Sequence, residues 1–354
     1  MPDALLPNPK PIDKITPTEL IAINHCLWRV AFDRDTTMAK LRRSTPATAL
    51  GNVVHLVMRK LGDPSGFDEV WNKAVADAYE RLNTDWAPAV PPSPESWPGW
   101  SLARVRLRKA WARSGNRSAR QSPASKSTPP ASLPWRERRL EHPRLPIAGI
   151  PDLVERIDKQ LWVIDIKTGL NQADPSPEQR LQLLIYCGLV HATLGEMPTY
   201  AAVETTRGDR FSFVVDRDEV EDSLGSAVEA VNLFNSAAEN GFTETLASPA
   251  PDACKWCPYR TACRPFLLSC KKDWEISHTV LFRVTSAAVH DHRSVVEGVV
   301  TLPNWHVNQT FVSVGFPFEE LPSVGETWAA TDYVGGVPSA VASWNTITFR
   351  WPSS

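Results

Sequence analysis

The chain has 354 residues, of which 42% are hydrophobic and 22% charged, and its formal net charge is −2. These values are typical of a globular protein, and the length favours two compact units over one. The opening residues lack the basic start, apolar run and cleavage site of a signal peptide, and no run of about 18 apolar residues occurs. The absence of G-x-x-x-x-G-K-[ST] excludes a P-loop motor. We therefore expect a cytoplasmic protein without membrane contact.

Three helices are predicted before residue 87, because residues 17–34, 48–60 and 67–86 carry apolar side chains at helical spacing. Thr16 or Thr18 is a suitable N-cap for the first helix. Composition then changes, and 87–134 is rich in Pro and Ser.

The Pro- and Ser-rich insertion, residues 87–134, is also basic. Residues 87–99 and 114–134 are interpreted as mobile linkers around a short helix, SLARVRLRKAWAR. No acidic residue occurs from Ser96 to Pro134, which suits a polyanion such as DNA, although an ordinary solvated loop is the alternative. The candidate DNA-binding residues of this helix are Arg104, Arg106, Arg108 and Lys109.

Strands and helices alternate after the insertion. A hairpin at 148–169 precedes a helix at 176–194, a second hairpin turns at 207–209, and a helical pattern covers 217–239. This order predicts an α/β core with a mixed sheet flanked by helices. Residues 271–354 read instead as short strands separated by turns, which predicts an all-β module with a small OB-like barrel as one candidate.

The first hairpin places charged residues where apolar ones would pack. On LWVIDIK, Asp165 and Lys167 share one face of the strand. If Asp158 and Lys159 form a two-residue turn, Asp152 lies opposite Asp165, with Cβ atoms about 5 Å apart. Two facing carboxylates are stable when a cation lies between them, and oxygen donors suit Mg²⁺ or Mn²⁺. A surface hairpin with ordinary charges is the alternative.

A cysteine cluster follows the long helix. CKWCPYRTAC places Cys254, Cys257 and Cys263 in a C-x2-C-x5-C pattern that lacks a fourth ligand. Cys270 is nearest in sequence, and Cys26 is the other candidate. The residues alone favour a zinc site closed by Cys270.

Four short motifs together resemble the PD-(D/E)xK nuclease superfamily, in particular its RecB-like branch. GIPD and IDIKTG match the second and third motifs, QLLIY matches Q-x-x-x-Y, and LGNVVH matches G-x-x-x-H. That branch includes the CRISPR-associated RecB-like exonucleases and the nuclease domains of helicase–nuclease complexes. The resemblance covers roughly 15–268 and implies a restriction-endonuclease-like core within a nuclease domain at 1–270, followed by the β-module at 271–354.

The resemblance also implies roles for residues of this chain. Lys167 would position or deprotonate the attacking water, and Gln182 and Tyr186 would contact nucleic acid or orient the site. The implied ligands of Mg²⁺ or Mn²⁺ are His55, Asp152, Asp165 and the carbonyl of Ile166. An ordinary buried histidine is the alternative for His55.

For the cysteines, the resemblance implies a [4Fe–4S] cluster with one ligand before the nuclease motifs and three after. TPTELIAINHCLWR is similar to the segment with the first ligand, although Leu27 stands where proline is usual. Cys187 and Cys270 would then be free thiols, and zinc at the same ligands is the alternative. The implied cluster ligands are Cys26, Cys254, Cys257 and Cys263.

These features predict a divalent-metal-dependent DNA exonuclease that acts on single strands or DNA ends, in DNA repair, recombination or defence against foreign DNA. A helicase or a CRISPR adaptation protein is the expected partner. The alternatives are a non-catalytic DNA-binding or scaffold subunit and a zinc-binding interaction protein. The enzyme is favoured because Asp152, Asp165 and Lys167 are all present.

Overall fold

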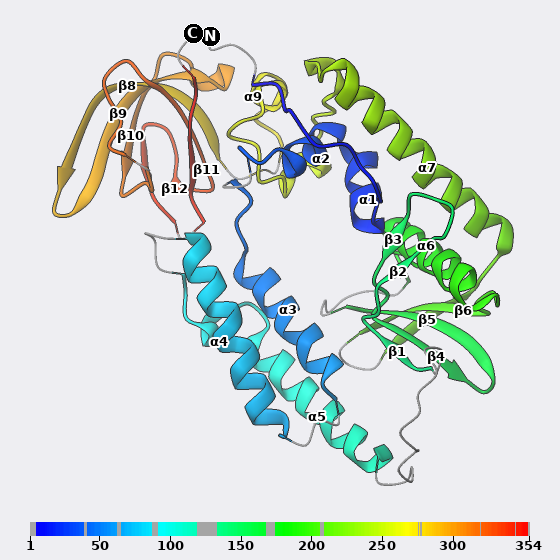
Figure 1. The fold of residues 1–354 in the computed structure, drawn as a ribbon. Helices are drawn as coiled ribbons and strands as arrows, with labels where there is room; N and C mark the ends of the chain where they lie inside the picture. The colour runs from blue at the N-terminus through cyan, green and yellow to red at the C-terminus, as the bar shows by residue number, and fades with distance from the viewer. Residues whose placement is uncertain are drawn as a thin grey trace.

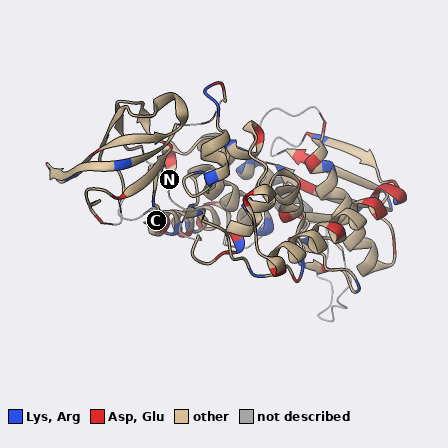
Figure 2. Cartoon of the chain, turned by 90° about the horizontal axis from the view of Figure 1, so that it is seen from above, with Lys and Arg blue, Asp and Glu red and all other residues tan. Residues whose placement is uncertain are grey.

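The structure is a computed structural model that describes residues 5–38, 41–61, 65–86, 91–118, 133–167, 174–205, 209–274, 276, 278–318, 320–343 and 345–352. Three groups of elements follow one another around the molecule in Figure 1: a helical lobe, a sheet covered by helices, and a C-terminal β-module. In the described part of the chain, no helix is long and apolar enough to cross a membrane. Figure 2 shows cationic and anionic residues mixed over the chain, in keeping with the small net charge.

The first predicted helix is wrong in one respect, because 17–34 forms two helices. They are α1 (Pro17–His25) and α2 (Leu27–Arg34), and the backbone between them is extended at Cys26. Thr16 caps α1 as predicted: its hydroxyl accepts a hydrogen bond from the Glu19 N–H, and Glu19 bonds back to the Thr16 N–H. The break sets Cys26 at a corner between two helices.

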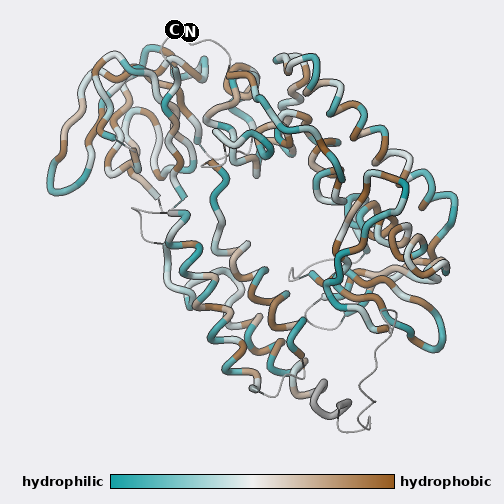
Figure 3. Tube along the Cα trace, viewed as in Figure 1, coloured by the Kyte–Doolittle hydropathy of each residue, from teal (hydrophilic) through white to brown (hydrophobic). Residues whose placement is uncertain are grey.

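The helical lobe consists of α3 (Pro46–Arg59), α4 (Phe67–Trp86), the short helix η2 (Pro94–Ser96) and α5 (Trp100–Ser118). It has a hydrophobic core of its own, which includes Val54, Trp71 and Leu82. The brown stretches along α3 in Figure 3 belong to this core.

Part of the predicted mobile linker at 87–99 is folded. Trp97 is 2% exposed, lies edge-on to Trp100, and donates its indole N–H to the carbonyl of Pro92. Apolar burial of two indoles outweighs the local tendency of Pro and Ser to form linkers. Residues 87–90 and 119–132 of the predicted linkers lie outside the described residues.

A five-stranded sheet carries the central hairpin. Its order is β1 (Trp135–Arg136), β4 (Leu153–Ile157), β5 (Gln160–Lys167), β6 (Tyr200–Thr205) and β7 (Arg210–Val214). Only β5 and β6 pair in parallel among these strands, and α6 (Pro177–Leu194) connects them. A two-stranded ladder of β2 (Leu140–Glu141) and β3 (Ala148–Gly149) lies beside it.

The predicted hairpin turn is confirmed. Ile157 pairs with Gln160, and the two turn residues Asp158 and Lys159 have φ values of 50° and 71°. Positive φ at both positions matches the twist of the flanking strands. The register therefore runs from this turn to the pair Leu153–Ile164, one step before Asp152 and Asp165.

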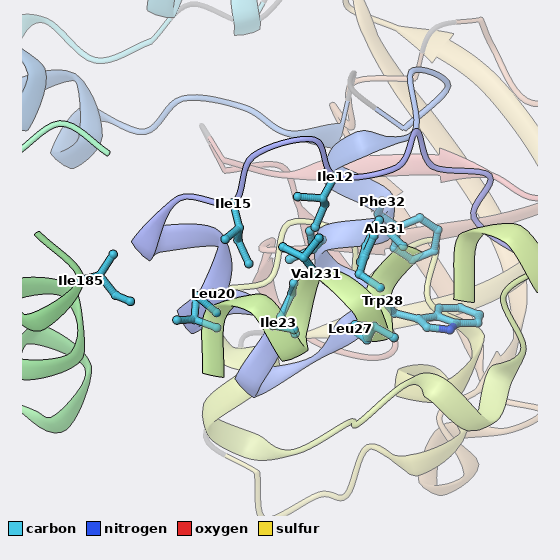
Figure 4. Packing of buried hydrophobic residues seen from close by; sticks show 14 of the residues in the cluster. Ile12, Ile15, Leu20, Ile23, Leu27, Trp28, Ala31, Phe32, Ile185 and Val231 are labelled. Carbon is cyan, nitrogen blue, oxygen red and sulfur yellow. The ribbon is translucent and has the colours of Figure 1, made fainter. Parts of the chain in front are cut away.

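Helices cover the sheet and form the main hydrophobic core. Figure 4 shows Leu20 and Ile23 of α1 beside Val231 of α7 (Arg217–Asn240), with Ile185 of α6 at the same core. Ser176 caps α6 and Pro177 begins it, as predicted. The mixed sheet and its helices confirm the α/β core.

The C-terminal module is a curled seven-stranded sheet of the OB-like kind (Figure 1). Its strand order is β12, β13, β10, β9, β8, β11, β14. The strands are β8 (Thr279–His290), β9 (Arg293–Leu302), β10 (Thr310–Val314), β11 (Thr327–Thr331), β12 (Val334–Gly335), β13 (Ser339–Val341) and β14 (Ile347–Arg350). This confirms that the C-terminal part of the chain is an all-β module.

The module packs on the cysteine segment, α8 (Pro251–Lys255) to α9 (Arg264–Ser269). Arg260 donates to both carboxylate oxygens of Asp332, at 2.8 and 2.7 Å, and the Trp351 indole N–H donates to the Thr261 carbonyl at 3.0 Å. The main hydrophobic cluster contains residues from both sides of this junction. The domain boundary at 270 therefore stays a prediction, because the core is continuous across it.

Replacing Trp351 tests whether the module shares that core. Trp351 is 2% exposed, so Trp351→Ala should lower the free energy of unfolding by about 3–5 kcal/mol. The matched control is Trp256→Ala, since Trp256 is 77% exposed and its loss should cost less than about 0.5 kcal/mol. Urea unfolding followed by circular dichroism measures both. Equal stability of the two variants would contradict the shared core.

Candidate active site

Two carboxylates meet at the open end of the β4–β5 hairpin. Asp165 lies on β5 and is 3% exposed, while Asp152 directly precedes β4. The Ile166 N–H donates to Asp152 Oδ2 at 2.6 Å, which fixes Asp152 across from β5. The structure thus brings together the two aspartates that the hairpin register predicted to lie opposite each other.

A chain of polar contacts continues from Asp165 to α6. Lys167 Nζ lies 2.9 Å from Asp165 Oδ2 and 3.5 Å from Gln182 Oε1. Gln182 donates to the Tyr186 hydroxyl at 3.1 Å, because residues four apart lie on one helix face. The lysine is therefore held between a buried carboxylate and a side-chain amide.

The glycine of GIPD has a packing reason. A Cβ atom built on Gly149 would lie 2.7 Å from the Tyr186 ring. Only glycine lets β3 approach the ring this closely without moving it. Gly149 and Tyr186 together set how close the segment before Asp152 lies to α6.

The helical lobe contributes His55 from α3. His55 Nδ1 lies 3.4 Å from Asp152 Oδ1 and 3.6 Å from Glu137 Oε1. Hydrogen bonding to Asp152 and then to Glu137 raises the pKa of His55 to about 10. His55 therefore joins the aspartates, and in this arrangement it is a cation between two carboxylates.

Glu137 is a site residue that the sequence did not single out. Its Oε2 accepts from Arg59 at 3.1 Å, and its N–H donates to the Asp152 carbonyl at 3.1 Å. It also has a φ of 45°, a conformation that non-glycine residues rarely adopt. The local sequence WRERRLE offers no signal that separates it from Glu141, since only the fold places Glu137 beside α3.

The donors around Asp165 suit a hard divalent cation. Asp165 Oδ2 is buried and accepts no hydrogen bond of regular geometry, although Lys167 is within ion-pair distance. Burial is the main cause that raises the pKa of Asp165; Lys167 lowers it and Asp152 raises it. A cation would remove this cost, and two carboxylates with an imidazole are suitable ligands. Within the described ranges, however, no three His, Cys, Asp or Glu side chains already form a metal-binding group.

The basic helix α5 is less available than predicted. Arg106 is 9% exposed, so little of its side chain is available for the DNA contact that the sequence predicts. Arg104 pairs with Asp68 at 3.3 Å, and Arg108 also pairs with Asp68. Lys109 is exposed. Part of the positive charge of α5 is therefore neutralised by Asp68 within the helical lobe.

A second candidate site is a pocket where the predicted cluster ligands meet. Aromatic side chains of Trp28, Phe32 and Tyr259 form part of its wall. Cys270 is not among its lining residues, although it is nearest to the other cysteines in sequence. The cysteines that line the pocket are Cys26, Cys254, Cys257 and Cys263.

Burial disfavours the thiolate form in this cysteine pocket, and two arginines offset part of that effect. Burial raises the pKa of Cys257 to about 12 and that of Cys263 well above its usual value. Arg29 lowers the pKa of Cys257, and Arg260 lowers that of Cys254, although burial outweighs both. The thiols are free, and a metal group would supply the positive charge that their ionisation needs.

No curated protein matches the chain. The crystal structure of SSO0001 aligns with 61% of this chain and 86% of that one, at 18% identity and a TM-score of 0.29, which is too low to support an argument. A sequence profile of the PD-(D/E)XK nuclease superfamily matches residues 14–264. Because that match covers more than half of the chain and includes every side chain that meets at the carboxylate site, the chain belongs to the PD-(D/E)XK nuclease superfamily.

Proposed function

We propose that the protein is a divalent-metal-dependent DNA exonuclease of the RecB-like branch, acting on single strands or DNA ends. The observation that carries the proposal is a buried carboxylate, Asp165, held 2.9 Å from the Lys167 ammonium and facing Asp152 across the hairpin. Repair, recombination or defence against foreign DNA is the proposed setting, with a helicase or a CRISPR adaptation protein as partner. These finer assignments rest on the motif resemblance.

The site residues have different roles in phosphodiester hydrolysis. Asp152, Asp165, His55 and the Ile166 carbonyl would hold Mg²⁺ or Mn²⁺, which supplies Lewis acidity at the scissile phosphate when bound. Lys167 orients the attacking water and stabilises the charge that develops on the phosphate oxygens. Gln182 and Tyr186 keep the lysine in place, because Gln182 contacts both.

We also propose that the cysteine pocket holds a [4Fe–4S] cluster. The support is that four cysteines line one pocket, one from the segment before the nuclease motifs and three from the segment after them. Two arginines line the same pocket. Such a cluster would tie the start of α2 to the segment after α7, a mechanical role. Zinc at the same cysteines is the competing assignment.

The carboxylate site is tested by Asp165→Asn and Lys167→Ala. Each should lower Mn²⁺-dependent cleavage of end-labelled single-stranded DNA by at least about 100-fold, since each removes a charge aimed at the reacting phosphate. Asp158→Asn is the matched control, because Asp158 lies in the exposed hairpin turn. Wild-type rates in the Asp165 or Lys167 variant, with the fold intact by circular dichroism, would refute the site.

Metal affinity should rise with pH. Binding requires a neutral His55 and an ionised Asp165, and the pKa of each is raised in the metal-free protein, so protons compete with the metal and are released when it binds. Calorimetric titration with Mn²⁺ at two pH values about 2 units apart, below the His55 pKa of about 10, should give tighter binding at the higher pH. Glu137→Gln should shift this dependence to lower pH. An affinity that does not change with pH would contradict the proposed ligands.

The cysteine assignment is tested by comparing Cys26→Ala with Cys270→Ala. Protein purified without oxygen should be brown and absorb near about 400 nm if it holds an iron–sulfur cluster. Cys26→Ala should lose that band and melt earlier, whereas Cys270→Ala should retain both properties. The opposite result would identify Cys270, and not Cys26, as the fourth ligand. If the purified protein is colourless and contains zinc, the pocket is a zinc site and the cluster assignment is wrong.

A further inference from the structure

The β-module holds the loop before Cys263 at two successive residues. Arg260 Nη2 donates to Oδ1 and Oδ2 of Asp332 at 2.8 and 2.7 Å, and the Thr261 carbonyl accepts from the Trp351 indole N–H at 3.0 Å. Figure 1 shows this segment, in yellow, between α2 and the β-module. A loop that carries a proposed cluster ligand is therefore fixed from the side of the β-module.

Asp332 is presented by a well-defined turn at the end of β11. Its backbone N–H donates to the His278 carbonyl at 3.1 Å, and its carbonyl accepts from the Thr346 hydroxyl at 3.0 Å. Asp332 also has a φ of 59°, a left-handed conformation that a non-glycine residue keeps only where surrounding contacts hold it. Because the backbone of Asp332 is fixed in this way, the β-module sets where the Arg260 guanidinium lies.

The same arginine belongs to the cysteine pocket. Arg260 lines this pocket together with Cys26, Cys254, Cys257 and Cys263, and its side chain is 5% exposed. Four thiolates carry more negative charge than zinc or the core of an iron–sulfur cluster neutralises, so the loaded pocket is anionic with either metal group. Burial raises the pKa of Cys254 and Arg260 lowers it, which shows that the arginine charge reaches a sulfur atom.

Stability alone does not explain a charged pair at this junction. Replacing a buried ion pair by packed apolar side chains is often neutral or stabilising, because both charges lose their hydration on burial. The junction already has apolar contacts, since Leu281, Phe349 and Trp351 of the β-module belong to the main hydrophobic cluster. An apolar pair in place of Arg260 and Asp332 would hold the two parts together equally well.

We propose that the β-module completes the metal site: Asp332 positions Arg260 beside the cysteines, and the Arg260 charge stabilises the anionic metal group. This inference rests on the proposed cluster and gives a role to the β-module, which lies outside the matched nuclease region. Charge and hydrogen bonding around the sulfur atoms are the means by which a protein sets the affinity and the reduction potential of such a group. Arg260 acts through its charge, and Asp332 acts through Arg260.

The double variant Arg260→Met/Asp332→Leu removes the charges and fills the space. It should unfold at the same urea concentration as wild type, because apolar replacement of a buried pair costs little. Protein purified without oxygen should nevertheless lose iron to a chelator about 10-fold faster, the usual effect of removing a group that supports metal ligands. Its midpoint potential should fall, since a nearby positive charge favours the reduced, more anionic cluster. The absorption near about 400 nm follows both properties.

Asp332→Asn tests the positioning residue by itself. Asparagine keeps a side-chain oxygen for Arg260 but removes the carboxylate charge, so the guanidinium charge is no longer offset and the midpoint potential should rise. The two variants should therefore shift the potential in opposite directions. A pair that merely joins the β-module to the core would produce neither shift.

The matched control is a second ion pair beside the cysteines. Arg264 follows Cys263 and pairs with Glu244 at 2.7 Å, but neither residue is among those that line the pocket. This pair is partly exposed, so Arg264→Met/Glu244→Leu should leave the rate of iron loss within about 2-fold of wild type.

The possible failures can be told apart. If the double variant keeps iron as long as wild type at an unchanged potential, the pair is a structural link and the cluster proposal stands. If wild type contains zinc, the cluster proposal fails, and zinc transfer to a chelator decides: a rate about 10-fold faster in the double variant supports the role of Arg260, and equal rates refute it. If wild type holds neither metal, both proposals fail. If the double variant unfolds early, an unchanged potential in Asp332→Asn refutes the inference.

Discussion

The buried charge of Asp165 is the constraint on which the site depends. A carboxylate that is 3% exposed is costly unless a cation approaches it, and the fold provides Lys167 at 2.9 Å on the same strand face. Asp152 shares that cost because the hairpin register sets it opposite. The hairpin turn at Asp158–Lys159 is far from this chemistry, yet it fixes which residues face each other, since a slip of one residue would turn Asp165 into the opposite face.

The helical lobe reaches this site by polar contacts. Its hydrophobic cluster is separate from the main one, whereas His55 and Arg59 of α3 contact Asp152 and Glu137. Polar contacts of this kind are broken more readily than an apolar interface, because water or a metal can take the place of either partner. Glu137 has a particular place here: it faces two cations of α3 while its backbone N–H holds the Asp152 carbonyl.

Sequence reasoning reached the site because its signals are local. The alternation along LWVIDIK placed Asp165 and Lys167 on one face, and a two-residue turn fixed Asp152, so short-range rules sufficed. Glu137 was missed because only tertiary contact with α3 distinguishes it. The burial of Arg106 was not foreseen, because a charge count does not reveal that a helix turns this side chain inward. Residue 26 was assigned to a continuous helix because the spacing of apolar residues does not reveal a break between two helices.

That corner at Cys26 connects the nuclease core to the rest of the fold. An uninterrupted helix would carry residue 26 along the α1 axis, whereas the extended backbone lets Cys26 line the same pocket as Cys254, Cys257 and Cys263. The same cysteine segment holds the β-module through Arg260 and Thr261. A metal group in this pocket would therefore stabilise two junctions at once. Because α2 leads through the following segment to α3, which carries His55, order at the cysteines also bears on the position of His55 at the carboxylate site.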